Sequence, residues 1–120
     1  MQRVWIALGS LAGLIAVALA ALAAHRLDAI EPGRMVMFRN ALQMQGWHAL
    51  ALLFCGIWAP RAGWLVNAAG TAFTAGLLLF CGAVDTLALS GTSLGMIAPI
   101  GGTLLLLGWL FLLLSALRTG

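Results

Sequence analysis

Residues 4–24 read VWIALGSLAGLIAVALAALAA, and these 21 positions contain no charged side chain. A transmembrane helix needs about 20 consecutive apolar residues to cross the hydrocarbon core of a bilayer. Two later stretches, 64–84 and 96–117, are as long, and their polar residues are limited to Asn67 and a few hydroxyl side chains. The sequence therefore predicts at least three membrane-spanning helices.

The composition of the whole chain agrees with this pattern. Its 120 residues are 63% hydrophobic and 8% charged, whereas soluble domains contain about 45–50% apolar and about 25% charged residues. So few charges cannot cover a water-soluble globule, which excludes a soluble enzyme, a secreted disulfide scaffold and a disordered tail. The net charge of +3 results from six arginines and three acidic residues, and the arginines are spread along the chain, so nucleic acid is not an expected partner.

A further helix is expected between the first two apolar stretches. The apolar run that ends at Ala59 is too short to span alone, but joined to residues 35–47 it is long enough, with a polar first half. We therefore expect an all-α polytopic membrane protein with one domain, 1–120, and four transmembrane helices in one bundle. These helices are expected near residues 4–24, 35–59, 64–88 and 95–117.

Short polar connections support four helices. Proline is favoured in a first helical turn, so Glu31-Pro32-Gly33 should begin the second helix. Residues 59–61, Ala-Pro-Arg, and 90–93, Ser-Gly-Thr-Ser, are expected to form the next two turns. The first apolar stretch is longer than the roughly 7–15 residues of a signal-peptide core, so we expect an uncleaved anchor.

Arginines distinguish the two sides of the bundle poorly. Four spans place both termini on the side of Pro60, with Arg3, Arg61 and Arg118, opposite Arg26, Arg34 and Arg39. Cytoplasmic loops are usually enriched in arginine and lysine, but these numbers are nearly equal. We expect a bacterial inner-membrane protein with both termini in the cytoplasm.

Polar residues gather in one half of the membrane. At a rise of 1.5 Å per residue, His48 lies roughly 16 Å from the Pro60 side, near mid-membrane, and Asp85 lies roughly 30 Å from it. Burial of ionisable groups in a span is unfavourable, which makes them functional candidates by default. The candidate site comprises the polar and helix-breaking residues of this half: His25, Arg39, Gln43, Gln45, His48, Asp85, Pro99, Gly101 and Gly102.

Two interpretations of His48 stay open. Neutral His48, with Gln45 one turn earlier on the same face, can hydrogen-bond to a neighbouring helix and fix the packing, which we favour. Alternatively, this pair binds a ligand, an ion or a proton beside a fourth helix that residues 99–102 interrupt, as broken helices do in transporters.

Other residues are expected to serve packing or anchoring. Asp85 should form a structural ion pair with His25, Arg26 or Arg39. Small residues on the first helix should form a packing seam: Gly9, Gly13, Ala16, Ala20 and Ala24. One face of the third helix should contain Asn67, Thr71, Thr74, Cys81 and Asp85. An interfacial aromatic belt is expected from Trp5, Trp58 and Trp64, whereas Trp47 and Trp109 should pack internally.

The sequence lacks the common motifs of enzymes and cofactor sites. Cys55 and Cys81 differ in depth by roughly 19 Å, which is too far for a disulfide. The two histidines differ by roughly 15 Å, too far to share one haem within a protomer. Zinc-ligand spacings, catalytic triads and nucleotide fingerprints are missing from the sequence. We therefore expect no metal, no cofactor and no enzymatic activity.

Four segments occur together in a recognisable order: 24–27 AHRL, 45–52 QGWHALAL, 87–91 LALSG and 99–102 PIGG, the last followed by Gly108-Trp109. Together they resemble the domain-of-unknown-function 423 family, an uncharacterised family with transmembrane protein 256 homologues. The resemblance covers nearly the whole chain. It implies a membrane protein of similar size, with several transmembrane helices and no established activity.

The candidate residues follow the family pattern only in part. His25, Gln45, His48 and Pro99 match it. The family usually has Gly-Ala-His where residues 23–25 are Ala-Ala-His, and Phe-Ser-Gly-Ser-Leu-Tyr where residues 80–85 are Phe-Cys-Gly-Ala-Val-Asp. A carboxylate therefore replaces the tyrosine at the end of the third helix.

Two functions follow as hypotheses. The first is a non-enzymatic membrane accessory: a subunit, an assembly factor or a lipid-organising protein. Its expected partners are membrane lipid and a homo-oligomer or larger membrane complex. The alternative is a protein that binds or transports a small ligand, an ion or a proton through the His48/Gln45 cluster.

Overall fold

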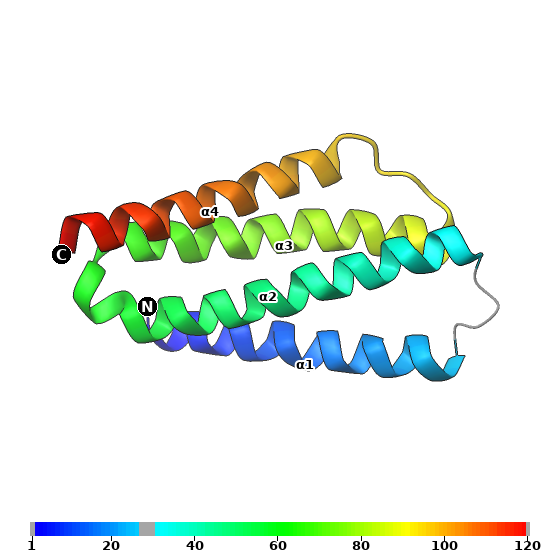
Figure 1. Cartoon of the computed structure of the whole chain (residues 1–120), viewed down its shortest axis with the longest axis horizontal. Helices are drawn as coiled ribbons and strands as arrows, with labels where there is room; N and C mark the ends of the chain where they lie inside the picture. Colours follow the sequence, from blue (N-terminus) through cyan, green and yellow to red (C-terminus); the bar gives the residue numbers. More distant parts are fainter. Residues whose placement is uncertain (1, 27–30, 120) are drawn as a thin grey trace.

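The computed structural model describes residues 2–26 and 31–119, which form four helices (Figure 1). The helices are α1 (Gln2–Arg26), α2 (Pro32–Ala62), α3 (Trp64–Ser90) and α4 (Ile97–Thr119). Three of them, α1, α3 and α4, are long and apolar enough to cross a membrane. The predicted all-α membrane bundle is confirmed, and each helix begins and ends close to its expected boundary.

The polar first half of α2 distinguishes it from the other three helices. Its 31 residues exceed the length of a span, but Arg34, Arg39 and Gln43 lower its apolar character. It contacts both α1 and α3 (Figure 1), and its buried Gln45 and His48 are turned towards neighbouring helices. We therefore treat α2 as crossing the membrane together with the helices that flank it.

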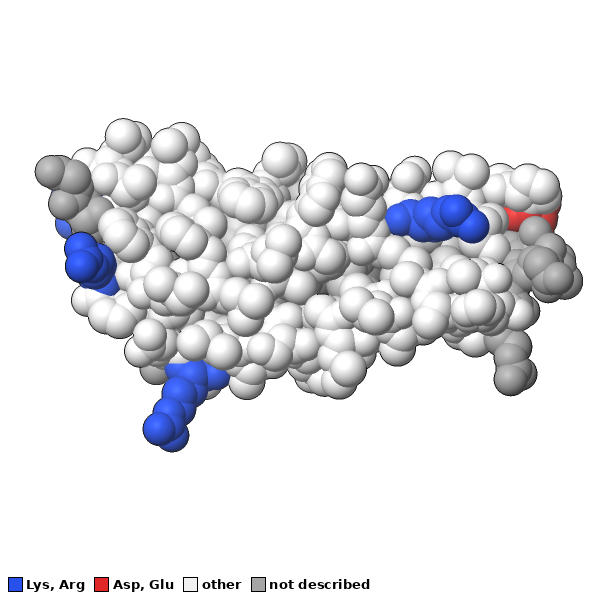
Figure 2. Space-filling view, turned by 60° about the horizontal axis from the view of Figure 1, so that its bottom comes forward, with Lys and Arg blue, Asp and Glu red and all other residues white. Residues whose placement is uncertain are grey.

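The four helices form a flattened row in the order α1, α2, α3, α4, with both termini at one end (Figure 1). The molecule measures 50 × 27 × 18 Å, with the helices along its longest dimension. Figure 2 shows one face of the molecule, with charged side chains towards its two ends and an uncharged band between them. This distribution suits a protein whose middle lies in the hydrocarbon core.

The turn expected at residues 59–61 lies a few residues later, at Gly63, which follows the end of α2. The helix continues through Pro60 and ends at Ala62. Gly63 then reverses the chain with φ 64°, and its N–H donates to the carbonyl of Ala59 over 3.2 Å. A positive φ is accessible to glycine, whereas proline is fixed near −65°, which is compatible with a helix. The turn expected at residues 90–93 is confirmed where α3 ends.

The expectation that residues 99–102 interrupt the fourth helix is also wrong. α4 runs unbroken from Ile97, and Pro99 lies in its first turn, where a missing N–H breaks no intrahelical bond. Gly101 is buried where α4 approaches α3: a Cβ there would lie 2.9 Å from the carbonyl oxygen of Gly76. These residues therefore bring two helix backbones together.

The small-residue seam of α1 is confirmed only in its first half. Gly9 is buried so close to α2 that a Cβ would lie 2.8 Å from a backbone carbonyl oxygen. Ala16 and Ala23 are buried, but Ala20 and Ala24 are exposed. Positions seven apart stay on the contact line of helices that cross with a left-handed twist, whereas steps of four rotate away from it.

The expected tryptophan belt is wrong for Trp5, which is 3% exposed. Its indole N–H donates to Oδ1 of Asn67 on α3 over 2.9 Å. The indole N–H of half-buried Trp58 donates to Oγ of Ser115 on α4 over 3.1 Å. Buried indoles usually require such partners, so these two tryptophans connect helices within the bundle.

Candidate functional site

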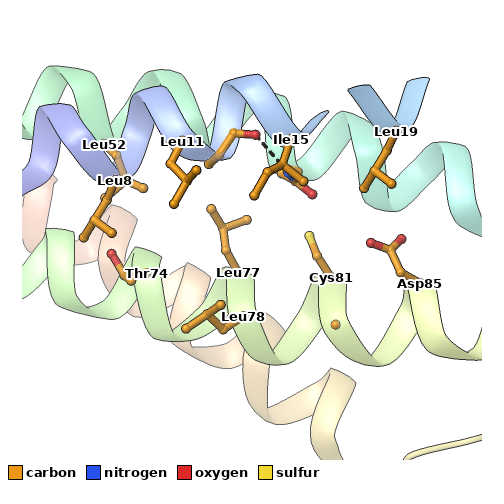
Figure 3. A pocket seen from close by; sticks show the side chains of 13 residues that line it. Leu8, Leu11, Ile15, Leu19, Leu52, Thr74, Leu77, Leu78, Cys81 and Asp85 are labelled. Carbon is orange, nitrogen blue, oxygen red and sulfur yellow. Dashed lines mark hydrogen bonds between the residues drawn. The ribbon is translucent and has the colours of Figure 1, made fainter. Parts of the chain in front are cut away.

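A groove between α1 and α3 is lined by two of the candidate residues, Gln45 and Asp85 (Figure 3). Its volume is about 250 Å³. The α1 wall consists of aliphatic side chains: Leu8, Leu11, Ala12, Ile15 and Leu19. The α3 wall is more varied: Thr74, Leu77, Leu78, Cys81, Gly82 and Asp85. α2 adds Gln45 and Leu52.

The two walls run in the same direction, so the ends of the groove can be identified. Leu8 lies opposite Thr74 at one end, and Leu19 lies opposite Asp85 at the other (Figure 3). Eleven residues separate the ends on each helix, which corresponds to roughly 16 Å. The groove therefore extends from Asp85, five residues before the end of α3, to the middle of the bundle.

Most polar groups in the walls are used by the protein itself. The Gln45 side-chain amide donates to the carbonyl of Ala12 on α1 over 2.9 Å. The Cys81 thiol donates to the carbonyl of Ala41 on α2 over 3.5 Å, and the Thr74 hydroxyl donates to the backbone of its own helix over 2.8 Å. These bonds leave the groove mainly apolar.

Asp85 is the exception among the wall residues. Its Oδ1 atom is buried and accepts no hydrogen bond from the described part of the chain. His25 and Arg39 are both exposed, and neither pairs with it, so the ion pair expected with these two residues is not observed. The third expected partner was Arg26, whose side chain lies outside the described residues. The Asp85 side chain as a whole is only half-buried, and an ionised carboxylate only accepts hydrogen bonds, so its other oxygen can receive a donor from a bound molecule.

His48 faces away from this groove and towards α4. It is 2% exposed, and its Nε2 accepts the indole N–H of Trp109 over 2.9 Å. Nδ1 lies 2.6 Å from the carbonyl oxygen of Met44, so the proton belongs on Nδ1 and the imidazole is neutral. Phe73 packs edge-on against the ring, with 5.4 Å between centroids. The predicted interhelical contact of His48 is thus present.

The structure does not bring the candidate residues into one site. Gln45 contacts α1, whereas His48 contacts α3 and α4. The side chains of His25, Arg39 and Gln43 are exposed. Gly101 lies eight residues before Trp109 on α4, roughly 12 Å along the axis, so residues 99–102 do not border His48. Asp85 and Gln45 are the candidate residues that line the groove.

A second hollow lies on the opposite side of α2, against α4. It measures about 530 Å³ and is lined by side chains without any titratable group: Trp47, Leu50, Ala51, Phe54, Trp109, Leu112 and Leu113. Trp47 and Trp109 are 55% and 47% exposed, so the expected internal packing is wrong for Trp47 and only partial for Trp109. This hollow therefore offers mainly van der Waals contacts to a ligand.

Sequence reasoning missed the α1 wall of the groove. The face of α3 that contains Thr74, Cys81 and Asp85 was the available signal, because these residues share one side of a helix. It indicated polar character on that side but not the opening beside it. Leu11 and Ile15 on α1 cannot be told from lipid-facing residues by sequence.

The fold and groove define a small all-helical membrane protein with a lateral apolar cavity. A family model described as "Protein of unknown function (DUF423)" matches residues 19–102. The chain belongs to this family. No solved structure matches it.

Bacterial relatives span the whole chain. A UPF0382 membrane protein of Staphylococcus epidermidis is 36% identical over 119 residues, which cover 98% of both chains. The UPF0382 membrane protein YwdK of Bacillus subtilis is 31% identical over 121 residues, again 98% of both. A UPF0382 membrane protein of Haemophilus influenzae is 32% identical and covers 99% of this chain and 98% of its own. The protein is thus a bacterial membrane protein.

Proposed function

We propose that the protein is a non-enzymatic membrane accessory protein that holds an acyl chain of a membrane lipid between α1 and α3. The observation behind this proposal is the groove of about 250 Å³ with aliphatic walls. Apolar walls favour an apolar occupant, and in a membrane the available apolar molecules are lipids. Membrane lipid is accordingly the partner we propose.

The dimensions of the groove suit one chain of one leaflet. Its length between Asp85 and Thr74 is roughly 16 Å, and one leaflet contributes half of a hydrocarbon core about 30 Å thick. Cavities that enclose drug-sized ligands span about 300–1,000 Å³, so this smaller groove favours a narrow ligand.

The chemistry of the groove supports binding rather than catalysis. Gln45, Thr74 and Cys81 direct their polar groups at backbone carbonyls, and Asp85 is the remaining polar side chain among the described lining residues. A nucleophile hydrogen-bonded to a base is the usual signature of covalent catalysis, but the Cys81 thiol, one turn from Asp85, donates to the carbonyl of Ala41 instead.

The contacts of His48 favour packing over the alternative function. A ligand, an ion or a proton bound at His48 would have to displace either Trp109 from Nε2 or Met44 from Nδ1. His48 is also 2% exposed and does not line the groove. We therefore propose that His48 connects helices and binds nothing.

We further propose an inner-membrane location with both termini in the cytoplasm. Cysteine labelling tests the orientation, because native Cys55 and Cys81 are buried and should not react. Ser93→Cys, in the exposed loop before α4, should react with an impermeant maleimide in spheroplasts. Arg61→Cys should react only after permeabilisation. The reverse order of reactivity would contradict the proposed orientation.

Native mass spectrometry of the purified full-length protein tests lipid binding. Gly82 lines the groove, and a Cβ at this position meets no atom within 4 Å, so Gly82→Leu should fill the groove without a backbone clash. Gly46 on α2 is equally open but lines neither hollow, which makes Gly46→Leu the matched control. Wild type and Gly46→Leu should retain one lipid, and Gly82→Leu should lose it. Equal retention in all three would refute the proposal.

A further inference from the structure

We infer that the lipid held between α1 and α3 has a primary ammonium head group, which donates hydrogen bonds to the carboxylate of Asp85. This inference rests on the proposed function and adds the chemical class of the lipid. Phosphatidylethanolamine is the bilayer lipid of this class that serves as the probe below.

Asp85 lies at the depth of a lipid head group. It is five residues before Ser90, the last residue of α3, so its carboxylate is within roughly 8 Å of the helix end. The apolar part of the groove continues from there towards Thr74, in the middle of the helix (Figure 3). A lipid of that leaflet would place its head group beside Asp85 and one chain along the groove.

Among the lining residues that the structure describes, the groove has a single charged side chain, and it is at this end. Cys81 is the only other titratable residue in the described walls, and its thiol is bonded to the backbone of α2. Leu19, which faces Asp85 across the groove, offers only methyl groups (Figure 3). The buried Oδ1 atom of Asp85 has no donor among the residues that the structure describes.

A lipid ammonium group supplies what this carboxylate lacks. Burying a charged or polar group without hydrogen bonds is strongly unfavourable. A primary ammonium provides both an opposite charge and N–H donors, and charge-assisted hydrogen bonds are stronger than neutral ones. The chain of the same molecule fills the apolar part of the groove, so both contacts are made by one ligand.

Lipids with three different head groups on identical chains separate the contribution of the positive charge from that of the N–H donors. The ethanolamine head has three N–H donors on its cationic nitrogen, whereas the choline head has the same charge without any donor. A phosphatidylglycerol head has a net negative charge, which Asp85 would repel. The structure therefore predicts preference for the ethanolamine lipid over both of the others.

The test uses the full-length protein in nanodiscs that contain equal amounts of phosphatidylethanolamine, phosphatidylcholine and phosphatidylglycerol. Native mass spectrometry then reports which lipid stays bound after release. Wild type should retain the ethanolamine lipid about fivefold over each competitor, as expected for one charge-assisted hydrogen bond at a partly exposed site. Asp85→Asn, which keeps the volume of the side chain, should retain one lipid but lose this preference. Thermal unfolding followed by circular dichroism checks that Asp85→Asn is folded.

The outcomes distinguish a failure of the head-group inference from a failure of chain binding. Equal retention of the three lipids by wild type overturns the inference, as does equal retention of the ethanolamine and choline lipids. A preference that persists in Asp85→Asn overturns it too. All three results leave chain binding intact. If Gly82→Leu retains as much lipid as wild type, the proposed function itself fails, whatever the order of head groups.

Discussion

Trp109 on α4 donates its indole N–H to Nε2 of His48 on α2 over 2.9 Å, across 61 positions of sequence. Nδ1 of the same imidazole lies 2.6 Å from the carbonyl oxygen of Met44. The bond connects two helices that α3 separates in the row (Figure 1). A buried histidine whose two nitrogens both have protein partners is thereby held as a neutral packing residue.

Trp109→Phe removes the indole N–H but keeps an aromatic ring against Phe73, whose centroid lies 5.1 Å away. We expect the free energy of unfolding to fall by about 0.6–2 kcal/mol, the range of interhelical hydrogen bonds in membranes. Reversible unfolding in mixed micelles measures this change. Trp47→Phe, at a position 55% exposed, is the matched control and should change stability little. Equal effects of the two variants would contradict the contribution of the hydrogen bond.

Substitutions of His48 should affect stability and leave the groove intact. His48→Ala opens a cavity and leaves the Trp109 N–H unpaired, so we expect a loss of about 2–4 kcal/mol. His48→Gln should recover part of this loss, because its side-chain oxygen can accept the indole N–H. Both measurements use the same unfolding assay. Since His48 does not line the groove, His48→Gln should retain its lipid. Loss of lipid with unchanged stability would revive the alternative in which His48 binds a ligand.

Glycines on the helices should respond in opposite directions to alanine. Gly101→Ala places a Cβ against the backbone of Phe80 on α3, and overpacking of this kind lowers stability by about 1–3 kcal/mol. Gly82→Ala and Gly46→Ala enter open space, so the better helix propensity of alanine should raise stability by about 0.5–1 kcal/mol. Thermal unfolding in detergent distinguishes the two classes. A stabilised Gly101→Ala would show that α3 and α4 are further apart than described.

The helices could be predicted from sequence because lipid leaves the backbone few alternatives. Residues 4–24 and 96–117 are long apolar stretches whose hydrogen bonds must be made internally, so hydropathy alone locates them. The turn between α2 and α3 is predicted too early in the sequence, because proline often ends a helix. Pro60 is nevertheless compatible with the last turn of α2. Gly63, the residue that permits a positive φ, was the more informative signal.

The groove could be predicted only in part. The helical rise per residue predicts that Asp85 lies near one membrane interface. It does not predict which way the side chain points around the helix axis. In the structure the carboxylate faces Leu19 rather than His25 or Arg39. In lipid, leucine is found both on the outer surface and in the interior of a bundle. Leu11 and Ile15 therefore gave no sign that they line a cavity.

Photo-crosslinking tests most directly whether the groove holds a lipid chain. The probe is phosphatidylethanolamine with a diazirine at the end of one acyl chain, irradiated with the full-length protein in nanodiscs and mapped by peptide mass spectrometry. With the head group at Asp85, the chain end lies roughly 16 Å away along the helices, so adducts should concentrate around Leu8 and Thr74 and disappear in Gly82→Leu. Adducts spread evenly over the exposed faces of α1 and α4, and unchanged in Gly82→Leu, would contradict lipid binding in this groove.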